Sequence, residues 1–73
     1  MSVEIGKQIG LNINEARRAA GLTQAQLAAR LVTASQEVSR LERGRDSVPT
    51  LTTLLRVACA LELSLADLLD GVE

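Results

Sequence analysis

Apolar residues recur at helical spacing in five short runs, and residues that start or stop helices bound each run. Ile5, Ile9 and Ile13 stand four residues apart, which is the spacing of one helix face. Glycine follows the first, third and fifth runs, where a helix commonly ends in a left-handed conformation. No segment alternates with the period of two that a strand requires. The chain is therefore predicted to be all-α, a compact bundle of five helices.

The predicted helices are short, with ranges of about 3–20, 24–31, 34–43, 50–61 and 64–69. Gly6 and Gly10 weaken the first of them, because glycine inside a helix costs about 1 kcal/mol relative to alanine. A Ser or Thr followed three residues later by a Gln or an acidic residue has the spacing of a capping box. Three helices are predicted to begin with such a pair: Thr23 with Gln26, Thr33 with Gln36, and Ser64 with Asp67.

The residue types that most catalytic and metal sites use are missing. The 73 residues include no histidine, no aromatic residue and one cysteine, Cys59. A disulfide within the chain is impossible, and a zinc site lacks its usual ligands. Without histidine or paired thiols the common general bases and nucleophiles are absent, so we expect no enzyme activity, metal or cofactor. Cys59 is predicted to be a small buried hydrophobic residue rather than a redox sensor.

The length fits one domain, spanning residues 1–73. No apolar run approaches the roughly 18 residues that a membrane span needs, and the N-terminus lacks a signal-peptide pattern. A cytoplasmic protein without a membrane partner is therefore expected.

Charge is unevenly distributed along the chain, although the formal net charge is only −1. Residues 17–45 hold six basic residues against two acidic ones, which gives +4. Residues 46–73 hold one basic residue against five acidic ones, which gives −4. A basic middle segment indicates one face for a polyanion and another turned away from it. The alternative is that these charges only line solvated faces.

The second and third predicted helices, joined by a short turn, have the arrangement of a helix-turn-helix. Leu27, Ala28 and Leu31 would bury one face of the first helix of the pair, and Val38 and Leu41 one face of the second. The outer face of that second helix is then polar and uncharged to basic, which suits the major groove, where Gln and Arg read adenine and guanine. Its outward residues are Ser35, Gln36, Glu37, Ser39, Arg40 and Arg43.

At these residues the chain resembles the lambda-repressor-like regulators of the Cro/C1 type, also called the XRE family. The similarity runs from about residue 9 to residue 69 and is strongest in ARRAAGLTQAQLAARL, EVSRLERG and PTLTTLLRVACALELSLADLL. It implies a five-helix bundle that binds double-stranded DNA as a two-fold dimer, with residues 34–43 as the recognition helix.

The resemblance also implies roles for individual residues. Arg17 and Glu42 match a partly buried ion pair that ties the first helix to the third. The implied base contacts are Ser35, Gln36, Glu37, Ser39 and Arg40, and the implied phosphate contacts are Gln24, Arg43 and Arg45.

Two of these roles have a simpler alternative. Gln24 could be an ordinary helix residue, and Arg40 could form a surface ion pair with Glu37. Arg18 and Arg30 are expected to be solvated.

Two residues of the turn depart from the family pattern. Val32 stands where the family usually has glycine, and Ala34 stands where it usually has a polar N-cap. Because a β-branched residue disfavours positive φ, this turn is expected to be reshaped or strained.

The sequence as a whole predicts a sequence-specific transcriptional regulator that binds a two-fold operator as a homodimer. The last two helices hold more apolar residues than their own packing needs, and Val48, Leu51, Leu55 and Val72 are predicted to form the dimer face. The acidic balance and the irregular turn support an alternative, a protein-interaction module that has lost DNA binding. A phage-type repressor, a restriction–modification controller and the antitoxin of a toxin partner all fit this sequence.

Overall fold

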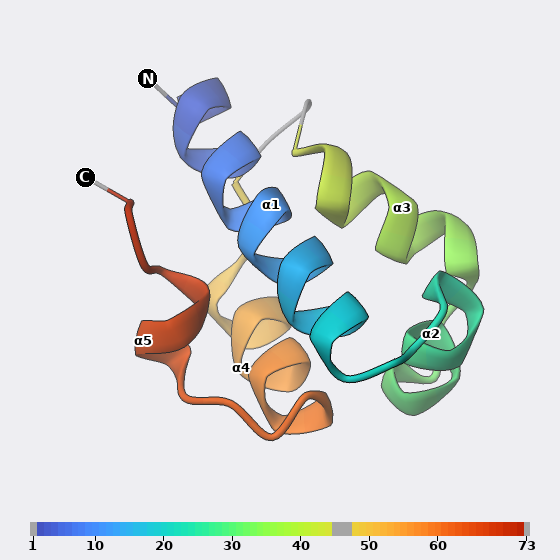
Figure 1. The fold of residues 1–73 in the computed structure, drawn as a ribbon. Helices are drawn as coiled ribbons and strands as arrows, with labels where there is room; N and C mark the ends of the chain where they lie inside the picture. Colours follow the sequence, from blue (N-terminus) through green and yellow to red (C-terminus); the bar gives the residue numbers. More distant parts are fainter. Residues whose placement is uncertain (1, 45–47, 73) are drawn as a thin grey trace.

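The longest helix, α1 (Ser2–Ala19), runs through the middle of the molecule, with α3 along one side and α5 along the other (Figure 1). The computed structural model describes residues 2–44 and 48–72, and the described residues contain helices but no strand. The remaining helices are α2 (Gln24–Leu31), α3 (Ser35–Arg43), α4 (Leu51–Ala60) and α5 (Leu65–Leu68). The predicted all-α bundle of five helices is confirmed.

The core receives at least one fully buried side chain from every helix. Burial of a Val, Leu or Ile side chain contributes about 1.5–3 kcal/mol, whereas isolated helices this short are marginal in water. The helices therefore depend on one another for stability. The largest fully buried side chains are Ile9 and Ile13 of α1, Leu27 of α2, Val38 of α3, Val57 of α4 and Leu68 of α5.

Two of the three predicted capping boxes are present. At α2, Thr23 Oγ1 accepts from the Gln26 amide at 3.0 Å, and Gln26 Oε1 accepts from the Thr23 amide at 2.8 Å. Ser64 and Asp67 make the same reciprocal pair of hydrogen bonds at the start of α5. The prediction that Thr33 caps the third helix is wrong, because the N-cap of α3 is Ala34, which has no side-chain cap.

The turn between α2 and α3 explains this correction. Val32 adopts a left-handed conformation, with φ 56° and ψ 52°, and its side chain is 88% exposed. Its amide donates to Ala29, and the Thr33 amide donates back to Ala28 at 2.9 Å, so both residues are used in ending α2. The extended backbone that precedes a helix is reached only at Ala34.

Glycines allow α1 and α3 to approach each other closely. A Cβ on Gly10 would overlap the backbone of Glu42 and would lie 2.8 Å from the carbonyl oxygen of Leu41. Gly44 ends α3 at φ +56°, and a Cβ there would overlap the backbone of Gly6. The sequence interpretation of Gly6 and Gly10 as helix-weakening residues missed this packing role.

Helix α4 has two apolar faces. Leu54, Val57 and Ala58 are buried in the core, whereas Leu51 and Leu55 are 61% and 50% exposed. Cys59 lies on the outer side and is exposed, so the prediction that it is a buried hydrophobic residue is wrong. Its position one turn after Leu55 places it on the exposed stripe rather than the buried one.

The chain after α5 is tied back to α1. The side-chain amide of Asn12 donates to the carbonyl oxygens of Leu68 at 2.8 Å and Asp70 at 2.7 Å.

No helix in the described part of the chain has the length and apolar character that crossing a membrane requires.

Candidate nucleic-acid interface

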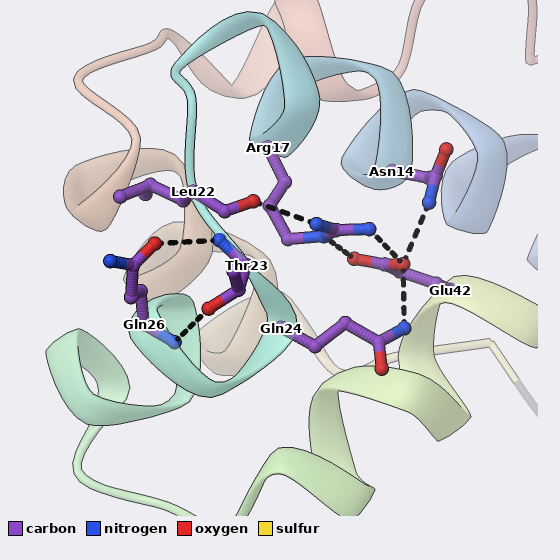
Figure 2. Close-up of polar contacts among 7 residues, drawn as sticks. All are labelled: Asn14, Arg17, Leu22, Thr23, Gln24, Gln26 and Glu42. Atoms are coloured by element: carbon purple, nitrogen blue, oxygen red, sulfur yellow. Dashed lines mark hydrogen bonds and ion pairs between the residues drawn. The ribbon is translucent and has the colours of Figure 1, made fainter.

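An ion pair between α1 and α3 holds the predicted recognition helix in place (Figure 2). Arg17 Nε lies 2.6 Å from Glu42 Oε2, and the two side chains are 12% and 5% exposed. The same guanidinium donates from Nη2 to Glu42 Oε1 at 3.2 Å and from Nη1 to the Leu22 carbonyl oxygen at 2.7 Å. Arg17 therefore joins α1, the chain entering α2, and α3.

Two amide side chains complete the shell around Glu42. Asn14 donates to Oε1 at 2.8 Å and Gln24 donates to the same oxygen at 3.0 Å (Figure 2). Burial raises the pKa of Glu42, but the hydrogen bonds from Arg17, Asn14 and Gln24, together with the charge of Arg17, outweigh burial and hold that pKa below its usual range. The carboxylate is thus ionised and fully paired at neutral pH.

The face of α3 opposite the core is polar and open to solvent. Gln36, Arg40 and Arg43 follow one another at i, i+4 and i+7 and are all exposed, while Val38 on the other side is 0% exposed. Ser35 is also exposed and Ser39 is half-buried. This stripe offers amide and guanidinium groups, which recognise base edges and phosphates by paired hydrogen bonds.

Glu37 lies at the edge of the stripe. It lines a hollow that is shared with Leu41 of α3 and with Pro49, Thr53 and Arg56. Its carboxylate pairs with Arg40 at 3.2 Å, with both side chains more than half exposed. An exposed pair of this kind contributes less than about 1 kcal/mol, so contact with DNA can replace it at small cost.

The predicted phosphate contacts are placed unequally. Arg43 is exposed at the end of α3. Gln24 lies at the first position of α2, where helix N-termini favour anions, and its amide also bonds to Glu42. Arg45 lies outside the described residues.

Of the residues predicted for the dimer face, three are exposed. Val48, Leu51 and Leu55 are 37%, 61% and 50% exposed and lie on α4 or just before it. Val72 is half-buried and packs against the core. The exposed part of the predicted face therefore belongs to α4 and its approach.

Two arginines have contacts that sequence reasoning missed. Arg30 is exposed, as expected, but its guanidinium also donates to the carbonyl oxygen of Ala60 at 3.0 Å. Arg56 donates to the carbonyl oxygen of Leu31. Their partners are main-chain atoms of distant helices, so no side-chain pattern in the sequence signals these contacts.

Comparison with known proteins decides the family. The HTH_3 helix-turn-helix family matches residues 13–68. The chain belongs to the HTH_3 family. The Cro/C1-type resemblance predicted from the sequence is thereby confirmed, and the family supports a DNA-binding transcriptional regulator. No curated protein sequence matches this HTH_3 chain.

Solved structures share the bundle. The restriction-modification controller protein C.AhdI from Aeromonas hydrophila aligns with a TM-score of 0.82 and 30% identity, over 90% of this chain and 94% of that one. The clp gene regulator ClgR from Corynebacterium glutamicum aligns with a TM-score of 0.82 and 32% identity, over 89% and 83%.

The same bundle also occurs within an enzyme. Hydroxypropylphosphonic acid epoxidase from S. wedmorenis aligns with a TM-score of 0.84 and 25% identity, over 92% of this HTH_3 chain but only 35% of that chain. The similarity covers a minor part of the enzyme, whereas it covers most of C.AhdI and ClgR. The comparisons therefore favour a non-enzymatic regulator.

Proposed function

We propose that this HTH_3 chain is a sequence-specific transcriptional regulator that binds a two-fold DNA operator as a homodimer. One observation carries the proposal: Gln36, Arg40 and Arg43 form an exposed stripe on α3, on the side away from buried Val38. When a helix-turn-helix protein docks on DNA, its recognition helix enters the major groove, and residues near the N-terminus of that helix contact the base edges.

The residues of the stripe have different proposed roles. Gln36 and Arg40 are long donors near the start and middle of α3, and they contact base edges together with Ser35, Ser39 and Glu37. Arg43 at the end of the helix and Gln24 at the start of α2 contact phosphates, which fix the register of the protein without reading sequence.

A homodimer would cover the outer face of α4. Leu51 and Leu55 are one helical turn apart and at least half exposed, and Val48 adds to the same end of the helix. Apolar side chains gathered in this way are typical of a protein-contacting surface. A dimer built on α4 would present two copies of α3 to half-sites one helical turn apart, about 34 Å.

A second candidate is a protein-interaction module that uses the same bundle without DNA. The acidic pI of about 5.3 favours it, because DNA-binding domains are usually basic. The net +4 charge of residues 17–45 favours DNA, since it places the positive charge on the segment that contains α3.

Selection of bound fragments from a random pool of double-stranded DNA distinguishes these candidates. The proposed regulator should recover fragments that share a half-site sequence, repeated with two-fold symmetry at one spacing. Arg40→Ala, run in parallel, should lose preference at one position of each half-site. Recovery of no fragments above the background of a protein-free control would instead support the interaction module.

A further inference from the structure

Two arginines outside the proposed DNA-contacting residues join α2 and α4 in a reciprocal way. Arg30 of α2 donates to the carbonyl oxygen of Ala60, the last residue of α4. Arg56 of α4 donates to the carbonyl oxygen of Leu31, the last residue of α2. Each helix thus places a cation on the C-terminal end of the other, where the helix dipole is negative.

The end of α4 shows why Arg30 matters. The last four carbonyls of a helix have no partner within that helix. Three of the last four carbonyls of α4 accept hydrogen bonds from backbone amides just after the helix. The carbonyl of Val57 accepts from Leu61 at 3.0 Å, that of Cys59 from Glu62 at 3.1 Å, and that of Ala58 from Leu63 at 2.8 Å. The remaining carbonyl, that of Ala60, accepts from Arg30.

The end of α2 is closed in a similar way. The amides of Val32 and Thr33 satisfy the carbonyls of Ala29 and Ala28. The carbonyl of Leu31, the last residue of α2, accepts from Arg56. The guanidinium thus binds at the residue immediately before left-handed Val32, where the chain turns toward α3.

These two contacts lie on the route between the recognition helix and the proposed dimer face. Helix α3 packs mainly against α1 and α2, and α2 in turn packs against α4. Arg56 itself stands next to Leu55 on α4. The angle between α3 and the outer face of α4 therefore depends in part on how α2 is held against α4.

We propose that Arg30 and Arg56 form a clamp that sets which spacing of the two half-sites the dimer accepts. They are positioning residues, and this role rests on the proposed homodimer. Adding one base pair between half-sites moves one of them by about 3.4 Å and rotates it by about 35°. A dimer whose α2 and α4 are fixed cannot follow that change, whereas one without the clamp can.

The test repeats the DNA selection with Arg30→Ala/Arg56→Ala beside the unchanged chain. A charge-matched control, Lys7→Ala/Arg18→Ala, removes two exposed cations of α1. Affinity is then measured by fluorescence anisotropy on duplexes with the selected half-sites and spacers one base pair shorter and longer. The unchanged chain and the control should lose about tenfold in affinity on the altered spacers, and the clamp variant less than about threefold.

Circular dichroism establishes first that both double variants are helical. If the alanine pair is unfolded, Arg30→Met/Arg56→Met replaces it, since methionine is a long side chain with good helix propensity that cannot donate a hydrogen bond, and the same broadening is expected. A clamp variant that keeps the sharp spacing preference overturns the clamp while leaving the proposed function standing. An unchanged chain that selects no shared half-site overturns the proposed function itself.

Discussion

Glu42 on α3 and Arg17 on α1 form an ion pair of 2.6 Å whose side chains are almost closed to solvent. The pair fixes α3, which carries the exposed polar stripe, against α1, which contributes Ile9 and Ile13 to the core. Its carboxylate accepts hydrogen bonds from Arg17, Asn14 and Gln24. The packing of α1 against α3 and the placement of the proposed DNA-contacting face are therefore linked through Glu42.

Stability should fall at acid pH because of Glu42. Its pKa is held below the usual range in the folded state, so its contribution is fully present above the unfolded-state value of about 4.3 and is lost as pH falls through the lower folded value. Urea unfolding between about pH 6 and pH 3 measures this loss.

Glu42→Gln provides the matched control. The variant keeps the shape of the side chain but leaves Arg17 without a counter-charge, which should cost about 3 kcal/mol at neutral pH. Its stability should also depend less steeply on acid pH than that of the unchanged chain. Identical pH profiles for the two proteins would show that Glu42 is not the titrating group.

Gly10→Ala should destabilise the protein by about 1–3 kcal/mol. Helix propensity alone predicts the opposite sign, a gain of about 1 kcal/mol. The structure reverses that expectation, because the new Cβ would meet the backbone of Leu41 and Glu42 and force α1 away from α3. Thermal unfolding measures the change, with Leu11→Ala at the next, exposed position as control. A more stable Gly10→Ala protein would contradict the close helix contact.

Val32→Gly should stabilise the protein by about 0.5–1 kcal/mol. Val32 has φ 56°, a backbone conformation that is strained for a β-branched residue. Its side chain is 88% exposed, so its removal costs little packing. Val32→Ala keeps a Cβ and should change stability less. Chemical denaturation of the three proteins gives the order, and a destabilised glycine variant would show that the Val32 side chain makes a stabilising contact.

The sequence predicted those parts of the fold that local residues determine. Thr23 with Gln26 and Ser64 with Asp67 cap their helices through neighbours three residues away, so spacing alone revealed them. Thr33 failed as a cap because the left-handed turn at Val32 moved the start of α3 by one residue. That shift depends on the backbone conformation at the end of α2, which cannot be read from the spacing between Thr33 and Gln36.

Contacts between distant helices were harder to predict. Arg17 with Glu42 came only from resemblance to a family, since the two residues lie on different helices. Gly10 was interpreted by its propensity, although its role is to let α3 approach. Arg30 and Arg56 bind main-chain carbonyls, which every residue carries, so no residue type marks the partner.

Arg40→Ala and Arg43→Ala should affect DNA binding in different ways. Loss of a base contact at Arg40 should cost about 1–3 kcal/mol on the selected operator and little on random DNA. Loss of a phosphate contact at Arg43 should weaken binding to both DNAs alike. Anisotropy titrations on both duplexes measure the ratio, with Arg18→Ala as control. Equal losses on both duplexes for the two variants would remove Arg40 from the base contacts.

The salt dependence of DNA affinity tests the central claim most directly. If the exposed face of α3 and the start of α2 lie on a duplex, each phosphate contact releases counterions, and log affinity falls linearly with log salt with a slope of about −0.9 per contact. Gln24 bears no charge, so the slope should come from the arginines, and Arg43→Ala should reduce its magnitude by about 1. The account predicts a steep line on the selected duplex between about 50 and 200 mM salt. A flat response, or no binding at the lowest salt, would contradict it.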